Sequence, residues 1–293
     1  MAQRNGITIL WFLAITLVVS GVFQALMIAA NDIGAADGNY VTGLMWAPAL
    51  AAFLTVKIRQ LDSQVLGLAW GGNGYAAFSY VTPLAYLAIA YGLVWLLGFG
   101  SFPNPQALER IAQRFGWTMT DPLWFTTAYF VLIATTNAIE TIARGLGEEI
   151  GWRGLLTPMM VDRFGFVGGS VLVGVIWALW HMPILLFANY NSETPWWFAA
   201  PCFFALTIGL SVIMTWFRLK SKSVWPCAIL HGTHNLFIHR FFTPLTGTTG
   251  PETPFAIDEF GIAVPAIIAL FAVGFYLQWR RARELAVPQA AAP

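Results

Sequence analysis

Residues 147–154 read Gly-Glu-Glu-Ile-Gly-Trp-Arg-Gly, and they place three ionisable side chains at the end of a long apolar run. The preceding residues 123–142 carry a single charge, Glu140. A charge at membrane depth is costly, so it marks a functional site by default and requires a partner. On a helix Glu149 and Arg153 lie one turn apart and can pair, whereas Glu148 points about 100° away and is left for another task.

Two later apolar segments contain further polar residues. His181 follows Trp177 by four residues, and His231 precedes Asn235 by four, so each pair shares one helix face. Taken singly, each group has a plain explanation: charges that cap a span, or a histidine hydrogen-bonded in the core of a bundle. Polar side chains on three segments would each need a partner in lipid. We therefore expect Glu148, His181, His231 and Asn235 to converge on one cavity.

Such a set of side chains could hydrolyse an amide bond. Glu148 would take a proton from water and return it to the leaving amine, while His181 would hold that water from a second direction. His231 and Asn235 would donate hydrogen bonds to the oxyanion of the tetrahedral intermediate. Zinc held by Glu148, His181 and His231 is an alternative, but the His-Glu-x-x-His spacing is absent and Asn235 is a poor zinc ligand. We expect no metal and no other cofactor.

The composition indicates the elements that would position these side chains. The chain has 293 residues, of which 58% are hydrophobic and 10% are charged, whereas about 25% of residues are charged in soluble domains. A membrane-spanning helix needs roughly 20 mainly apolar residues. Eight segments approach this length, at residues 7–30, 41–56, 76–99, 122–146, 167–188, 196–217, 224–242 and 261–279. The sequence predicts an all-α, polytopic transmembrane bundle of about eight spans.

We predict one integral membrane domain over residues 1–293. Within it, residues 1–110 would be scaffold spans, residues 120–245 the motif-bearing catalytic core, and residues 288–293 a flexible tail. Net charge is only +1, and we expect no nucleic-acid partner. The expected partners are the lipid bilayer and a peptide or membrane-protein substrate.

The distribution of basic residues predicts an orientation, because cytoplasmic loops carry an excess of Lys and Arg. Eight spans with the N-terminus inside leave three basic residues outside: Arg110, Arg114 and Arg240. The inner loops and termini would hold the other twelve: Arg4, Lys57, Arg59, Arg144, Arg153, Arg163, Arg218, Lys220, Lys222, Arg280, Arg281 and Arg283. This bias predicts that both termini are cytoplasmic, and the Ala/Gly-rich composition favours the inner membrane of a prokaryotic cell.

The three motifs resemble those of the CPBP family of intramembrane glutamic endopeptidases. That family includes the CAAX prenyl proteases of the Rce1 type and bacterial relatives linked to bacteriocin self-immunity. Its Glu-Glu-x-x-x-Arg motif is similar to Glu148, Glu149 and Arg153, and its His-x-x-x-Asn motif is similar to the pair at residues 231 and 235. The Phe-x-x-x-His motif matches at His181 but has Trp177 in the aromatic position. The resemblance covers about residues 120–245.

This resemblance implies Glu148 as general base, His181 as the residue that positions water, and His231 with Asn235 as the oxyanion site. It implies an orienting role for Glu149 and Arg153, and a cavity open toward the cytoplasm. We expect a metal-independent endopeptidase that acts near the cytoplasmic interface. Whether it performs CAAX-type processing, and whether it recognises prenyl groups, stays open. A non-proteolytic immunity or scaffold protein that uses the same motifs for binding is the alternative.

Overall fold

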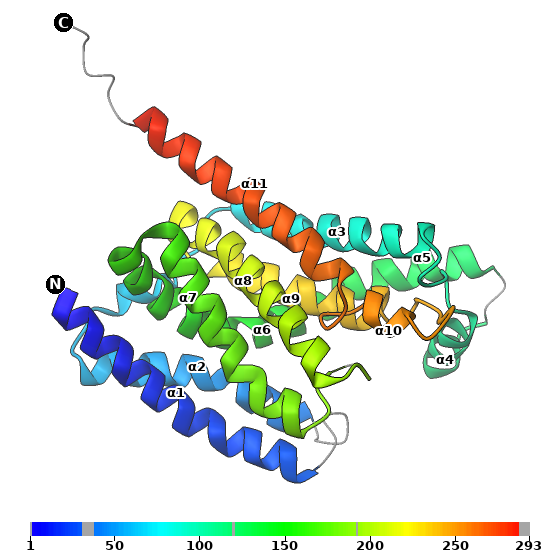
Figure 1. Cartoon of the computed structure of the whole chain (residues 1–293), viewed down its shortest axis with the longest axis horizontal. Coiled ribbons are helices and arrows are strands. Elements are labelled where there is room, and N and C mark those ends of the chain that lie inside the picture. The colour runs from blue at the N-terminus through cyan, green and yellow to red at the C-terminus, as the bar shows by residue number, and fades with distance from the viewer. Residues whose placement is uncertain (1, 31–37, 119–120, 192, 287–293) are drawn as a thin grey trace, which may run out of the picture.

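The structure is a computed structural model that describes residues 2–30, 38–118, 121–191 and 193–286. It is 82% helical, and the described residues form no strand. The α-helices are α1 Ala2–Ala30, α2 Gly38–Ile58, α3 Asn73–Leu96, α4 Pro105–Phe115, α5 Pro122–Leu132, α6 Ala138–Glu149, α7 Thr157–Phe187, α8 Trp196–Ser221, α9 Trp225–Phe237, α10 Thr253–Ala256 and α11 Ala263–Ala286 (Figure 1). The predicted tail 288–293 lies outside the described residues.

Short segments of other helical types join or extend these helices. A 3₁₀ turn, η1, covers Ser63–Leu66. Three π-helical segments are η2 Ile133–Asn137, η3 Ile150–Leu156 and η4 Ile238–Phe242. The segment η3 begins directly after Glu149, and π-bulges of this kind occur frequently at functional sites.

Helices cover most of each of the eight predicted segments, which confirms a helical membrane bundle. By length and composition, the described residues contain six helical runs able to cross a membrane. The numbers differ because residues 122–187 form one helical run of 66 residues, interrupted only where Gly165 adopts a φ of 73°. In addition, α9 has only 13 residues. The count of eight spans and the location of the termini stay predictions.

The helices that carry the motifs pack closely because glycine allows their backbones to touch. A Cβ atom added at Gly232 of α9 would lie 2.5 Å from the backbone of Ile142 in α6. Small residues at such interfaces permit close helix approach in membranes. This contact sets α6 directly against α9 and brings the first and third motifs together.

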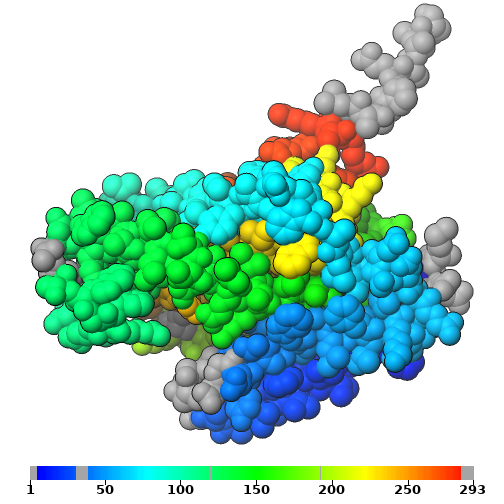
Figure 2. Space-filling model, turned by 180° about the vertical axis from the view of Figure 1, so that it is seen from behind, coloured from blue at the N-terminus to red at the C-terminus, as the bar shows by residue number. Residues whose placement is uncertain are grey.

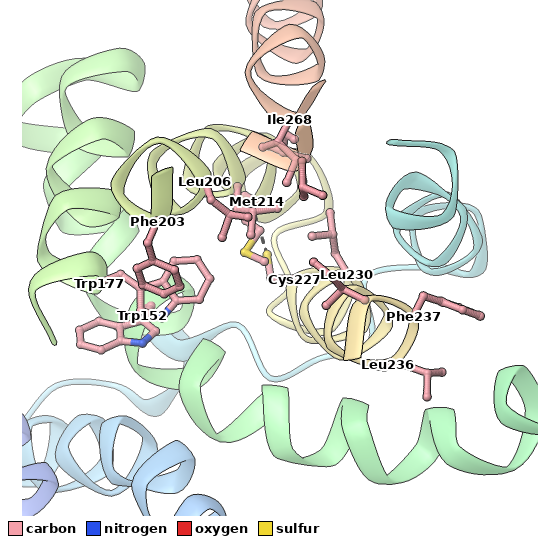
Figure 3. Close-up of a cluster of buried hydrophobic side chains, with 14 of the residues drawn as sticks. Trp152, Trp177, Phe203, Leu206, Met214, Cys227, Leu230, Leu236, Phe237 and Ile268 are labelled. Atoms are coloured by element: carbon pink, nitrogen blue, oxygen red, sulfur yellow. Dashed lines mark hydrogen bonds between the residues drawn. The ribbon is translucent and has the colours of Figure 1, made fainter. Parts of the chain in front are cut away.

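The hydrophobic core lies between α8, α9 and α11, as Figure 3 shows with Met214, Cys227 and Ile268 pointing toward one another. At the left of the same view the side chains of Trp152, from η3, and Trp177, from α7, lie near each other. The Cys227 thiol donates to the Met214 carbonyl at 3.3 Å. This core fixes α9 against α8 and leaves the face of α9 toward α6 for polar side chains.

One end of the bundle is marked by basic residues and held together by polar contacts. Asn5 donates a hydrogen bond to Asp162 at 3.1 Å, joining α1 to α7. Arg218 of α8 donates to the Val65 carbonyl at 3.0 Å, joining α8 to the loop after α2. We call this end, which also holds the last turns of α11, the basic end. The helix α4 and the loops 188–195 and 243–262 lie at the opposite end (Figure 1).

Candidate active site

Side chains from all three motifs line one cavity of about 330 Å³. Glu148 from α6, His181 from α7, and His231 with Asn235 from α9 all face it. The structure therefore brings together the four residues that the sequence predicted to converge. The rest of the wall consists of apolar side chains and a second cluster of polar side chains, Tyr190, His234 and Glu259. In Figure 2 a few orange residues are visible deeper in the molecule, between green residues above and blue residues below.

Glu148 is 2% exposed and is held by two tryptophan side chains. The indole N–H of Trp177 donates to Glu148 Oε2 at 2.8 Å, and that of Trp152 donates to the same atom at 3.3 Å. Both bonds fall on one oxygen, so the second oxygen is available to a water molecule in the cavity. The family motif has phenylalanine where this chain has Trp177, and phenylalanine could not make this bond. The departure adds a donor that fixes the carboxylate.

Glu149 connects the first motif to the third. Its Oε1 atom accepts from Arg153 at 3.0 Å, as the spacing predicted, and lies 2.8 Å from His231 Nδ1. Glu149 and Arg153 are fully buried, and the guanidinium of Arg153 stacks on Trp177 at 4.4 Å. The contact between Glu149 and His231 could not be read from helical spacing, because it depends on how α6 approaches α9.

The hydrogen bonds of the two cavity histidines determine which ring nitrogen carries a proton. His181 Nδ1 lies 2.9 Å from the Trp177 carbonyl, which can only accept, so Nδ1 donates and Nε2 is the acceptor of the neutral ring. His231 Nδ1 likewise donates to the Glu149 carboxylate. His231 Nε2 can then donate only in the imidazolium form, a charge that Glu149 would stabilise.

A second polar cluster on the cavity wall was missed by the sequence analysis. Glu259, from the loop before α11, accepts from Tyr190 at 2.9 Å and lies 3.0 Å from His234 Nε2. The other ring nitrogen of His234 lies 2.9 Å from the Tyr86 hydroxyl. Tyr190 also stacks on His181, with ring centroids 6.1 Å apart. The adjacent acids at 258 and 259, directly before an apolar segment, were the available signal.

The charge of Glu259 is stabilised although its side chain is buried. Burial alone would raise the pKa of this carboxyl, but His239, His234 and Tyr190 together lower its pKa to about 2. Opposite charges and hydrogen bonds favour the ionised form of a carboxyl group. Glu259 is therefore a carboxylate at neutral pH, and through Tyr190 it supports the ring of His181.

No group of three or more His, Cys, Asp or Glu side chains within the described ranges is arranged to hold a metal ion. Glu148, His181 and His231, the zinc set considered from sequence, line the same cavity but do not form such a cluster. Asn235 lines the cavity beside them and is half-buried.

The cavity extends toward the end of the bundle opposite the basic end. Its lining includes Met27 from the last turn of α1, Val41 from the first turn of α2, and Tyr190 and Glu259 from the loops of the opposite end. The expected opening toward the cytoplasm stays a prediction, because the described residues do not fix which membrane face each end of the bundle occupies.

The position of Arg144 requires a correction. The charge distribution placed Arg144 inside and Arg240 outside, at opposite faces of the membrane. Both side chains contact Glu140, Arg144 at 3.0 Å and Arg240 at 3.4 Å, so they lie together. The prediction failed because the helical run from Pro122 continues well past Arg144 before it reaches the basic end.

Comparison with known proteins gives a partial but specific match. Residues 122–237 match the family described as Type II CAAX prenyl endopeptidase Rce1-like. All four residues that converge on the cavity fall within this range, whereas Glu259 lies beyond it. The match covers the part of the chain that the motifs had indicated.

A curated relative is the protein named CAAX prenyl protease 2 of Methanococcus maripaludis. It is 34% identical over 96 residues, which make up 30% of this chain and 34% of the relative. The match thus spans about a third of the length of that relative. It supports a relationship over part of the chain.

Proposed function

Because the chain carries an Rce1-like domain over residues 122–237, we propose that it is a membrane-embedded endopeptidase. The observation that supports the proposal most strongly is the convergence of Glu148, His181, His231 and Asn235, from three helices, on one cavity. The relative's name refers to CAAX prenyl proteolysis, and we propose CAAX-type endoproteolysis as the reaction. Recognition of a prenyl group stays a prediction.

In the proposed reaction Glu148 acts as the general base. A water molecule donates one hydrogen to the carboxylate and the other to His181 Nε2, so that its lone pair faces the substrate carbonyl carbon. The water oxygen attacks this carbon while its proton passes to Glu148. Glu148 then delivers the proton to the amide nitrogen as the carbon–nitrogen bond breaks. The products are a free amine and a carboxylic acid, which loses its remaining proton to solvent water.

The developing negative charge needs donors placed where the carbonyl oxygen will be. The Asn235 amide and the His231 imidazolium, held by Glu149 at 2.8 Å, would supply them. This assignment gives Glu149 a positioning role, because its carboxylate stabilises the proton that His231 must carry. It also makes the third motif dependent on the first.

We propose that this chemistry requires no metal ion. Among the described residues no three His, Cys, Asp or Glu side chains are grouped so that they could hold a metal ion. A carboxylate and a histidine that share one water provide the activation that a metal would otherwise supply.

The test is cleavage of a panel of peptides and membrane-protein segments by the purified protein, with a metal chelator present. Glu148→Gln keeps the shape of the side chain and removes the base, so we expect cleavage to be lost. Glu109→Gln, the same change at an exposed position on α4, is the matched control and should cleave like the wild type.

Two results would contradict this proposal. Cleavage abolished by the chelator and restored by zinc would show that a metal is required. A Glu148→Gln variant that retains both its fold and its biological effect in cells would favour the alternative, a non-proteolytic membrane protein that uses the motif residues for binding.

A further inference from the structure

Another pocket, of about 370 Å³, lies between α4, α5, η2 and η4 and adjoins the catalytic cavity. His239 and Arg240 line both spaces, so the two are neighbours. Arg114 of α4 adds a third basic side chain, and among the described residues no Asp or Glu lines this pocket. His239 also lies 3.8 Å from Glu259, so we assign the character of the site to the two arginines and call it the arginine pocket.

Contacts between several segments fix the walls of the arginine pocket. The Tyr129 hydroxyl of α5 donates to the Arg240 carbonyl at 2.9 Å, and the Phe115 ring of α4 lies 6.4 Å from the Tyr129 ring. The Arg240 side chain lies 3.4 Å from Glu140, but Glu140 is shared with Arg144 at 3.0 Å. One acid between two arginines leaves a net positive charge at this place.

A row of residues along α6 and the end of η2 leads from the proposed base to the arginine pocket. Four residues spaced by four, three and four share one helix face. They are Asn137, Thr141, Arg144 and Glu148. The last three line the catalytic cavity, whereas Asn137 lines the arginine pocket. The Asn137 amide oxygen accepts from Thr136 at 2.8 Å, which leaves the amide N–H groups as donors.

The length of this row determines how much of a substrate it can hold. A helix rises about 1.5 Å per residue, so Thr141 lies about 10 Å and Asn137 about 16 Å from Glu148 along the helix axis. An extended chain spans at most about 3.3–3.6 Å per residue. About three to five extended residues therefore reach from a scissile bond at Glu148 to the arginine pocket.

Arginine is suited to carboxylates, because its guanidinium group can donate parallel N–H bonds to both oxygens. We propose that the arginine pocket binds the terminal carboxylate of the peptide substrate, about three to five residues beyond the scissile bond. This subsite rests on the proposed function, and a C-terminal Cys-a-a-X sequence has its carboxylate within that range of the cysteine. Arg114, His239 and Arg240 lie outside residues 122–237, so the family match does not assign it.

The test compares two peptides that differ only in their last group, a free carboxylate or an amide. We expect the wild type to prefer the carboxylate peptide about 10–100-fold in kcat/KM, the usual effect of hydrogen bonds to a charged group, and mainly through KM. The double variant Arg114→Gln/Arg240→Gln should lose this preference. Arg110→Gln, an exposed position on α4 that does not line the pocket, is the matched control and should keep it.

Further variants separate recognition from folding. Arg240→Lys keeps the charge and should retain part of the preference, whereas Arg240→Gln should not. Arg114→Gln alone, at an exposed position, should lower the preference severalfold and provides the test if the double variant does not fold. Equal cleavage of both peptides by the wild type would overturn the subsite and leave the endopeptidase intact. A preference that survives in the folded double variant would overturn it as well.

Binding distinguishes failure of the subsite from failure of the proposed function. In the Glu148→Gln background the carboxylate peptide should bind more tightly than the amide peptide, and the two arginine substitutions should remove the difference. This binding pattern without cleavage of any peptide would support the subsite and contradict the proposed function. If both peptides bind alike and the double variant instead loses affinity for a short-chain anionic phospholipid, the pocket binds a lipid phosphate and the proposal is wrong.

Discussion

Replacing Glu149 by Gln tests the buried network that joins the first and third motifs. The change keeps the size of the side chain and removes its charge. Arg153 would then be a fully buried cation whose Nε and one amino nitrogen have no hydrogen-bond partner among the described residues. Its remaining favourable contacts would be a hydrogen bond to the amide oxygen at position 149, which is neutral, and the face of Trp177.

The expected cost is large because one member of a buried ion pair would be left alone. Such a loss typically destabilises a protein by about 3–5 kcal/mol. Each kcal/mol lowers the melting temperature of a 150–250-residue domain by about 2–4 °C, so we expect a decrease on the order of 10 °C. Glu149→Gln should also slow turnover, since His231 loses the carboxylate that stabilises its imidazolium.

The assay is thermal unfolding in detergent, followed by tryptophan fluorescence, with Glu109→Gln as the exposed control. The double variant Glu149→Gln/Arg153→Gln removes the stranded charge and should recover part of the lost stability without recovering turnover. A single variant that melts within about 2 °C of the wild type would refute the reasoning. So would a double variant whose loss exceeds that of the single one.

Three further predictions concern separate parts of the site. Asn235→Ala should lower kcat about 10²–10³-fold, the usual effect of losing one oxyanion donor, and leave the melting temperature unchanged. Unfolding of this variant in detergent would show that Asn235 has a structural role instead. Gly232→Ala places a Cβ 2.5 Å from the Ile142 backbone and should lower the free energy of unfolding by at least about 1–3 kcal/mol. The control Gly92→Ala, whose added Cβ meets nothing within 4 Å, should leave it unchanged. Equal melting temperatures of the two variants would contradict this prediction. Because the pKa of folded Glu259 is lowered to about 2, its charge stabilises the fold above pH 4.5, and that contribution is lost as pH falls toward 2. Glu259→Gln should therefore melt below the wild type at pH 7, with the difference shrinking between pH 4.5 and 2, and a constant difference would count against the stabilising charge.

Much of the site could be predicted from sequence because a membrane makes isolated polar side chains costly. Four polar residues on three apolar segments needed one another, and one cavity contains all four. The pair Glu149 and Arg153 followed from helical spacing alone. Local rules of this kind work where the partner is on the same helix or where lipid excludes other solutions.

The contacts that could not be predicted join residues far apart in the chain. The bond from Glu149 to His231 depends on the close packing of α6 and α9, and the bond from Trp177 to Glu148 depends on the position of α7. Glu259 reaches the cavity from a loop without periodicity.

Single-turnover cleavage by Glu148→Gln, with peptide affinity measured separately on the same preparation, tests the central claim most directly. Our account predicts an affinity within a few-fold of the wild type and a cleavage rate at least about 10³ lower, because removing a positioned base leaves the bound water unactivated. A cleavage rate within tenfold of the wild type would show that Glu148 is not the base and would contradict the account.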